Sequence, residues 1–327
     1  MLMSNLTVAI AELTATAGIG SVLKNEPLSR HNTWRIGGPA AVFVEPENAA
    51  QICRVVEIAS AHAVPLVVIG QGSNLLFDDR GIAGIVMKIG AKMAEVQVSG
   101  ERIVAEGGVW VPQLALASMR TGLSGLEHCI GIPGTLGGLV MMNGGSHRRG
   151  IGENIVTVDI VTSAGQRHTL SRETCEFSYR HSALQGSGCI VTGAELLCTP
   201  GKRNSIRREM LNDLRERRRK FPRKQPNCGS VFLSTAEMHA SVGPPGKIIE
   251  DAGLKGRRVG QASVSTQHAN FIVNLGGATA ADVLALIAQI RKVVRQSIGF
   301  DLCCEVRYVS PKGEILPAHL RAAELSV

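Results

Sequence analysis

Two glycine-rich segments carry the clearest chemical signal in this sequence. The first begins at Gly70 and reads GQGSNL, directly after the apolar run 66–69. A loop with so little side-chain bulk lets backbone N–H groups converge on an anionic oxygen, and Ser73 and Asn74 add short polar donors. Because Leu75 stands where a Rossmann fingerprint has its third glycine, the loop is no such fingerprint. We therefore predict a pyrophosphate-binding loop of another kind.

The second segment reads GLSGLE from Gly122, GIPGTLGG from Gly131 and MNGG from Met142. Glycine at this density lets the backbone approach a flat, extended ligand closely, although close packing of loops over a sheet would also explain this segment by itself. We call these two glycine-rich segments cradles. Two cradles are better suited to bind a dinucleotide than a single phosphate group. The glycines and Pro133 disfavour a membrane-spanning helix in the uncharged run 129–147, so we expect a loop there. The predicted cofactor-binding residues are Gly70, Gln71, Gly72, Ser73, Asn74, Leu75, Gly131, Ile132, Pro133, Gly134, Thr135, Gly138 and Asn143.

A basic segment, 202–224, holds the whole excess of positive charge. It contains eleven basic and three acidic residues, and the chain of 327 residues carries a net charge of +8. A basic stripe is one feature of nucleic-acid-binding proteins, but only Phe221 is interleaved with these charges, and their helical spacing suits a solvated, ion-paired face. We interpret the segment as a surface helix near an anionic small ligand. The alternative, a nucleic-acid-binding module, predicts a colourless protein with strongly salt-dependent binding to any duplex.

The composition indicates a globular protein. With 44% hydrophobic and 19% charged residues the chain is not disordered, and its length suggests two domains. The eight cysteines show neither a C-x-x-C pair nor zinc spacing, so we expect reduced thiols, no metal site and a structural role for Cys228. The first basic side chain, Lys24, comes too late for a secretory signal, which predicts a cytoplasmic location.

Alternating strand and helix patterns surround these segments. They predict helices over 48–61 and 111–119, and strands over 41–44, 65–69, 82–89, 94–98, 102–106, 154–162, 166–170 and 189–197. The basic helix ends at Pro222, since proline also restricts the residue before it. Beyond it we predict helices over 246–252 and 279–298, and strands over 258–263, 271–273 and 303–309.

The order of short motifs along the chain resembles the UDP-N-acetylenolpyruvoylglucosamine reductase family. Besides the two glycine segments, these motifs are RIGGPA from Arg35, Tyr179-Arg180, Gly229-Ser230, HANF from His268 and EVR from Glu305. Each motif is weak alone, but their shared order over roughly residues 27–310 is specific. The residues after Tyr179 resemble the shorter, second type of this enzyme.

The resemblance implies an α+β fold, in which a two-part FAD-binding domain of the vanillyl-alcohol-oxidase (PCMH) type precedes a C-terminal α/β substrate-binding domain. The expected boundaries are 1–26 for an N-terminal extension, 27–200 for the FAD-binding domain with its two subdomains, 201–224 for the basic linking helix and 225–327 for the substrate-binding domain. The resemblance also implies non-covalent FAD, NADPH as co-substrate and a UDP-sugar substrate. We further expect no nucleic-acid or membrane partner, and a monomer.

The implied reaction reduces the enolpyruvyl ether of UDP-N-acetylglucosamine to UDP-N-acetylmuramate, a peptidoglycan precursor needed for cell wall synthesis and cell division. Hydride addition leaves negative charge on the carbon beside the carboxylate, so the site needs positive charge, hydrogen-bond donors and then a proton. By the resemblance, Arg180 and Glu305 stabilise the enol and Ser230 donates the proton. The substrate-binding residues implied in the same way are Tyr179, His268, Asn270 and Arg307.

Two positions depart from the family pattern. Leu233 and Gln267 stand where the family has basic residues, which removes positive charge from the expected site of the UDP pyrophosphate. We expect Lys247 or the basic cluster 218–224 to compensate. The main alternative enzyme is another FAD-dependent oxidoreductase of the same fold. Such relatives often tether the flavin through a histidine in the first glycine loop, and residues 70–75 contain none.

Overall fold

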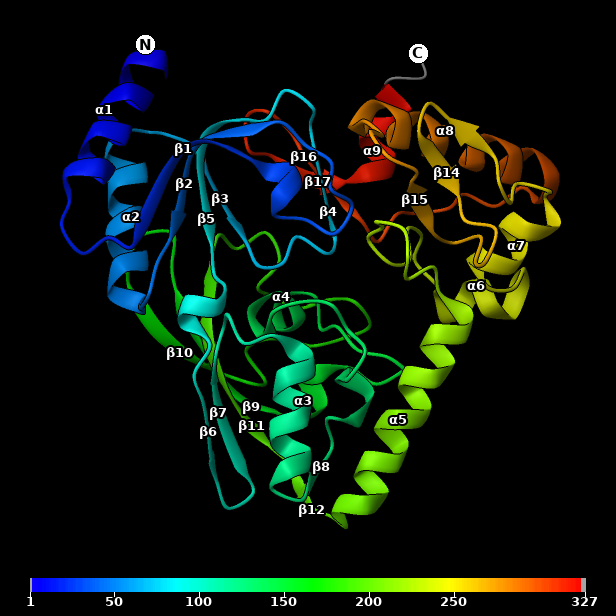
Figure 1. Ribbon diagram of the computed structural model, residues 1–327, viewed down its shortest axis with the longest axis horizontal. Helices are drawn as coiled ribbons and strands as arrows, with labels where there is room; N and C mark the ends of the chain where they lie inside the picture. Colours follow the sequence, from blue (N-terminus) through cyan, green and yellow to red (C-terminus); the bar gives the residue numbers. More distant parts are fainter. Residues whose placement is uncertain (1, 325–327) are drawn as a thin grey trace. The chain divides into compact units, whose positions relative to one another are not determined.

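The computed structural model describes residues 2–324, which form two compact units (Figure 1). The first unit comprises the chain up to residue 24 together with 42–71 and 84–217, and the second comprises 25–41, 72–83 and the chain from 218 onward. The first unit therefore differs from the predicted FAD-binding domain, which was continuous over 27–200. The reason is that segments 25–41 and 72–83 pack with the C-terminal part of the chain.

The helices are α1 Leu2–Ala15, α2 Ala49–Ala61, α3 Val111–Arg120, α4 Leu136–Met141, α5 Arg203–Lys220, α6 Ala236–Ser241, α7 Pro245–Asp251, α8 Ala280–Ile298 and α9 Ala318–Glu324. The strands are β1 Ser21–Pro27, β2 Pro39–Glu45, β3 Leu66–Ile69, β4 Leu75–Phe77, β5 Ile82–Lys88, β6 Val96–Ser99, β7 Arg102–Glu106, β8 Leu123–Ser124, β9 Ile155–Val161, β10 Arg167–Ser171, β11 Ile190–Leu197, β12 Thr199–Pro200, β13 Arg258–Val259, β14 Ala262–Val264, β15 Ile272–Asn274, β16 Arg307–Val309 and β17 Ile315–Pro317. Short 3₁₀ turns cover Leu28–Arg30, Ala91–Met93, Glu127–Cys129 and Ile151–Glu153.

The first unit is built on two sheets, each packed against helices. One sheet has the order β1-β2-β5-β3, with β3 parallel to β5, and shares a core with α1 and α2. Ala9 and Leu13 of α1 are fully buried there, so the predicted N-terminal extension contributes to the core. The other sheet is antiparallel, with the order β10-β9-β11-β7-β6, and shares a core with α3 and α4. A hairpin turn joins the antiparallel strands β9 and β10, with Gly165 at φ +77°.

The second unit is organised around α8. Thr279 and Asp282 form a reciprocal capping box at its start, and Gly299 ends it in the left-handed conformation at φ +69°. The buried face of α8 packs on the antiparallel sheet β13-β14-β15. A second small sheet, β17-β16-β4, pairs β16 in parallel with β4, which lies more than two hundred residues earlier in the chain. The indole Nε1 of Trp34 donates to the Ile272 carbonyl at 2.8 Å and ties segment 25–41 to this unit.

Three sequence-based predictions of local structure need correction. Residues 129–147 are not wholly a loop, since they contain α4, in which Gly137 fits tightly against neighbouring backbone. Residues 258–263 form part of a hairpin with a turn at Gly260, where φ is +52°, instead of one strand. The strand predicted over 303–309 begins only at Arg307, because residues 303–305 bond irregularly to 231–233 through Leu233 N to Cys303 O and Glu305 N to Val231 O.

The basic segment forms α5, one uninterrupted helix (Figure 1). Its buried residues, Ile206 and Met210, join the core of the first unit, while its last three residues belong to the second unit. The helix predicted for the basic segment is therefore confirmed, whereas its role as a link between domains stays a prediction.

Candidate functional site

The two glycine-rich segments meet within the first unit. A Cβ built on Gly70, at the end of β3, would lie 2.2 Å from Oγ1 of Thr135, in the GIPGTLGG motif. Real Cβ atoms do not approach so closely, so only glycine permits this contact. The structure therefore brings together two segments that the sequence had singled out separately.

Neighbouring glycines of α4 differ in what surrounds them. A Cβ on Gly137 would lie 3.2 Å from the carbonyl oxygens of Gly107 and Val191, so close packing explains this glycine. A Cβ on Gly138 would meet only Thr135 Oγ1, at 3.6 Å, and Gly138 is exposed. Packing within the described chain does not explain Gly138, and the open space beside it fits a ligand that approaches the backbone.

Helix α5 contacts the second glycine segment, which sequence reasoning did not foresee. A Cβ on Gly131 would lie 2.3 Å from Cδ of Arg217, so the aliphatic part of Arg217 packs on this glycine. One turn earlier, Asp213 Oδ1 lies 3.2 Å from Nε2 of His147. Part of the basic helix is thus engaged with the glycine-rich loops of its own unit.

The other half of the first loop belongs to the second unit. Gly72 has φ +62°, and a Cβ on it would lie 2.3 Å from the His31 carbonyl oxygen. Asn74 Nδ2 donates to the carbonyl of Glu305 at 3.2 Å, and Arg307 N donates to the carbonyl of Asn74 at 3.0 Å. The end of the loop is therefore held against two residues predicted to act in catalysis and substrate binding.

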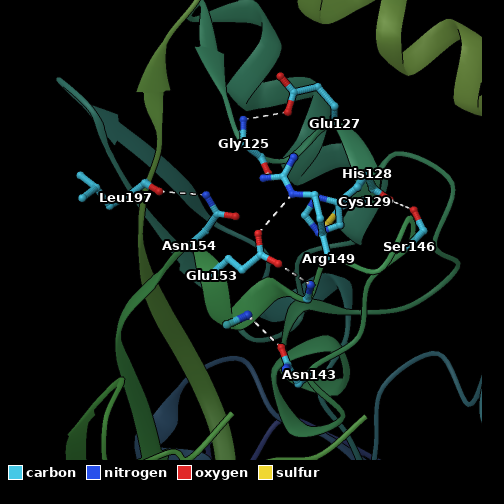
Figure 2. Close-up of polar contacts among 12 residues, drawn as sticks. Gly125, Glu127, His128, Cys129, Asn143, Ser146, Arg149, Glu153, Asn154 and Leu197 are labelled. Atoms are coloured by element: carbon cyan, nitrogen blue, oxygen red, sulfur yellow. Dashed lines mark hydrogen bonds and ion pairs between the residues drawn. The ribbon is translucent and has the colours of Figure 1, made fainter. Parts of the chain in front are cut away.

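A polar network joins the GLSGLE motif to the turn that follows the MNGG motif (Figure 2). Arg149 donates through Nε to Glu153 at 3.2 Å and through Nη2 to the Gly125 carbonyl at 3.1 Å. Glu127, which is only 2% exposed, accepts from Gly125 N at 2.7 Å and from Ser124 Oγ at 2.6 Å. The sequence signals that could have indicated this network are the charged residues inside an otherwise apolar, glycine-rich stretch.

His128 is buried beside this network, with its carbonyl accepting from Ser146 Oγ at 2.6 Å and its Nε2 lying 3.3 Å from Cys129 Sγ (Figure 2). Burial, together with the nearby charge of Arg149, lowers the pKa of His128 to about 4. The imidazole is therefore neutral in the folded protein at neutral pH, and it is only 3% exposed.

We expect acid to destabilise the protein through His128. The unfolded chain binds this proton below pH ~6.5, whereas the folded chain resists it down to a pKa of about 4, so stability is lost progressively between these values as the pH falls. Between pH 7 and pH 5 the loss is about 2 kcal/mol, and His128→Phe should remove it. Urea unfolding at both pH values measures the effect, with His168→Phe at an exposed histidine as the control. An identical pH dependence in wild type and His128→Phe would contradict the assignment.

Ser230 lines a cavity of about 300 Å³ in the second unit. Further lining residues are Phe221, Ser234, Pro244, Pro245, Gly246, Lys247, Glu250, Gln267, His268, Ala269 and Asn270. Phe221, His268 and Phe271 form an aromatic cluster with ring centroids 4.9–5.4 Å apart. Burial, with the charge of Lys255 adding to it, lowers the pKa of His268, which favours the neutral ring.

The departures from the family pattern can be placed in this unit. Gln267 Nε2 donates to the carbonyl of Arg219 at 2.9 Å. Lys247 lines the cavity and pairs with Asp251, while Glu250 contributes an acidic side chain to the same lining. Positive charge at the cavity thus comes from Lys247, in the first turn of α7.

Asn270 is 4% exposed, and both polar atoms of its side-chain amide form hydrogen bonds with the backbone of Phe232, two residues after Ser230. Its Oδ1 accepts from Phe232 N and its Nδ2 donates to Phe232 O, each at 2.9 Å. The structure therefore places Asn270 as a support for the Gly229-Ser230 turn, where Gly229 has φ +85°. Burial raises the pKa of the adjacent Cys228 thiol well above its usual value, so this cysteine stays protonated, as a structural residue would.

The predicted catalytic residues are divided between the units. Ser230 and Glu305 lie close in the second unit, since Glu305 N donates to the carbonyl of Val231 at 2.8 Å. Arg180 and Tyr179 lie in the first unit, where the Arg180 guanidinium is 5.5 Å from the centroid of the Tyr179 ring. The convergence of all three catalytic residues on one substrate stays a prediction.

Within residues 2–324 there is no group of three or more His, Cys, Asp or Glu side chains arranged to hold a metal ion. In the same part of the chain, no helix has both the length and the apolar character needed to cross a membrane.

Comparison with known proteins covers nearly the whole chain. Residues 221–309 match the family model of the UDP-N-acetylenolpyruvoylglucosamine reductase C-terminal domain, and residues 40–171 match that of an FAD binding domain. UDP-N-acetylenolpyruvoylglucosamine reductase 1 of Corynebacterium glutamicum is 47% identical over 91% of this chain and 89% of its own length. The reductase of Bacillus subtilis is 39% identical over 89% of this chain and 95% of its own length. The crystal structure of the corresponding reductase from Thermus caldophilus is 31% identical, with a TM-score of 0.74 over 88% of this chain and 98% of that one. These matches confirm the expected α+β fold with its FAD-binding part.

Proposed function

Because the chain belongs to the UDP-N-acetylenolpyruvoylglucosamine reductase family, a family of flavin-dependent reductases in peptidoglycan precursor synthesis, we propose that it reduces the enolpyruvyl ether of UDP-N-acetylglucosamine with NADPH. The observation that carries this proposal is the meeting of Gly70 with Thr135 beside the open face of Gly138. This contact brings the two predicted cradles together in one unit, and the space beside Gly138 leaves room for a ligand against the backbone.

The described residues fit FAD. Gly70, Thr135 and Gly138 would hold it in the first unit, where Gly138 is exposed and has no side chain, so a ligand can approach the backbone closely. When bound, FAD supplies the hydride-carrying chemistry that amino-acid side chains lack. The chain itself binds and orients the cofactor and the substrate, and it provides the side chains that stabilise negative charge and donate a proton.

Arg180, Glu305 and Ser230 are proposed to act on the substrate after hydride addition. The charge of Arg180 and its N–H donors would stabilise the enol formed beside the carboxylate, together with Glu305. Ser230 would then donate a proton to the neighbouring carbon. A serine is a weak acid, so this role requires a nearby group or water chain that stabilises the resulting alkoxide.

We assign the UDP part of the substrate to the cavity beside Ser230. Its lining offers the aromatic cluster of Phe221 and His268 for a planar base, and Lys247 as the positive charge that replaces those missing at Leu233 and Gln267. Of the predicted substrate-binding residues, we keep Tyr179, His268 and Arg307 as direct contacts and propose that Asn270 acts by holding the Ser230 turn. Burial lowers the pKa of Arg307, which nonetheless remains a cation at neutral pH.

A cytoplasmic monomer without a nucleic-acid partner is proposed as well. The nucleotide sugar and NADPH are cytoplasmic metabolites, which supports the location. The packing of Arg217 on Gly131 and the pairing of Asp213 with His147 support a role for α5 within the enzyme instead of on a nucleic acid.

We expect the purified protein to be yellow and to release its colour on denaturation, because residues 70–75 contain no histidine to tether the flavin. Absorption spectra of the supernatant after acid precipitation measure this. NADPH oxidation that depends on the enolpyruvyl nucleotide would then test the function. Flavin that remains with the precipitate would contradict non-covalent binding, and a flavoprotein inert toward this substrate would favour another oxidoreductase of the same fold.

A further inference from the structure

The turn that carries Arg180 is tight and strained. Ser178 and His181 exchange both backbone hydrogen bonds at 3.1 Å, which leaves Tyr179 and Arg180 at the tip. Arg180 has φ +54°, a left-handed conformation that favours glycine over a residue with a long side chain. Such a conformation persists when surrounding contacts fix it.

These contacts come from the last residue of α4 and the residues that follow it. Asn143 Nδ2 donates to the carbonyl of Ser178 at 2.7 Å, Ser182 Oγ donates to that of Met141 at 2.7 Å, and Arg180 Nη2 donates to that of Gly145 at 3.2 Å. All of these residues belong to the first unit. The stretch 141–145 continues directly from the helix whose first residues form the proposed flavin cradle.

Asn143 is the central member of this stretch. Its own backbone is left-handed, at φ +40°, and its Oδ1 accepts from Gly152 N at 2.9 Å (Figure 2). A Cβ on Gly150 would lie 2.5 Å from this oxygen, so glycine at 150 makes room for the amide. Both ends of the Asn143 side chain are thus engaged with backbone, one of them on the Arg180 turn.

We propose that Asn143 is a positioning residue for Arg180: it fixes the turn from which the guanidinium reaches the substrate, and is not a direct ligand of the cofactor as the sequence had suggested. This inference rests on the proposed function, in which Arg180 acts only in the half-reaction that consumes the enolpyruvyl substrate. Loss of the contact between Asn143 and the Ser178 carbonyl should therefore slow oxidation of the reduced flavin by the substrate, and it should leave reduction of the flavin by NADPH unchanged.

Asn143→Asp isolates the contact. The aspartate keeps the size of the side chain, its tolerance of the left-handed backbone and the acceptor for Gly152 N, but it turns an acceptor toward the Ser178 carbonyl in place of a donor. We expect about 10-fold slower reoxidation of the pre-reduced flavin by the substrate under anaerobic stopped flow. Flavin content and the rate of flavin reduction by NADPH should stay within about twofold of wild type. Asn143→Gly removes both hydrogen-bonding atoms of the side chain and adopts the left-handed backbone without strain. It should show the same selective slowing of reoxidation.

Asn25→Asp is the matched control, because Asn25 is exposed and also left-handed, at φ +53°, but belongs to the other unit. A second comparison places Asn143→Asp in an Arg180→Ala background, where it should slow reoxidation no further, since its action passes through Arg180.

Equal reoxidation rates for wild type and Asn143→Asp would overturn the inference, as would full additivity with Arg180→Ala. Loss of flavin from Asn143→Asp would instead make Asn143 a cofactor ligand. A wild-type protein whose reduced flavin does not respond to the substrate would refute the proposed function, and this inference with it.

Discussion

Ser230→Ala is expected to slow reoxidation of the reduced flavin by the enolpyruvyl substrate by about 10²–10⁴-fold, the usual cost of removing a positioned acid. Ser230 is proposed to act only after hydride has reached the substrate. Flavin binding and NADPH-driven reduction of the flavin should therefore remain nearly unchanged. The variant, mixed with both substrates, should accumulate reduced flavin.

Stopped-flow absorbance of the pre-reduced enzyme under anaerobic conditions measures this step directly. Ser234→Ala is the matched control, because Ser234 lines the same cavity while its hydroxyl lies 2.8 Å from His239 Nε2. Equal reoxidation rates in wild type and Ser230→Ala would remove Ser230 from the mechanism. No reoxidation by the substrate in either protein would point to another oxidoreductase of the same fold.

Local patterns were sufficient to predict most of the regular structure and to single out the two glycine-rich segments. The helix predicted over 279–298 is α8, since an apolar stripe and a capping pair both lie within a short stretch of sequence. The strand β7 occupies the predicted residues 102–106. The two glycine segments were recognised because glycine density is visible without knowing what surrounds each residue.

Pairings between distant segments could not be predicted in this way. The parallel pairing of β4 with β16 takes residues 72–83 into the second unit, and no periodicity within a window indicates which strand will be the partner. Glu305 was placed in a strand because its neighbours are apolar, yet the backbone there bonds to the chain after Ser230. The amides of Asn143 and Asn270 show the same limit, since sequence gives the side-chain type while the fold gives its hydrogen-bond partners.

Only the three-dimensional structure distinguishes a glycine that is needed for packing from one that faces open space. Gly137 and Gly138 are adjacent in one motif and look equivalent in the sequence. In the structure the first is confined by the carbonyls of Gly107 and Val191, whereas the second faces open space. The first is therefore a packing glycine, and the second is the candidate for close approach of the cofactor.

Gly138→Ala should separate cofactor binding from folding. Alanine in a helix is favoured over glycine by about 0.5–1 kcal/mol, and its Cβ would meet only Thr135 Oγ1 at an ordinary 3.6 Å. The free energy of unfolding of the apoprotein should thus stay equal or rise slightly. If FAD lies against this backbone, the added methyl group occupies its space, and affinity should fall about 10- to 100-fold.

Flavin fluorescence titration of the apoprotein measures the affinity, and urea unfolding of the same preparation measures the stability. Gly137→Ala provides the contrast, because its Cβ would press on two carbonyl oxygens at 3.2 Å and should lower the free energy of unfolding. Selective loss of flavin in Gly138→Ala, with the apoprotein as stable as wild type, would place the cofactor over this face of α4. Unchanged FAD affinity in Gly138→Ala would show that the open space beside Gly138 is not part of the cradle, and the binding loop would then have to lie around Gly70 and Gly134 instead.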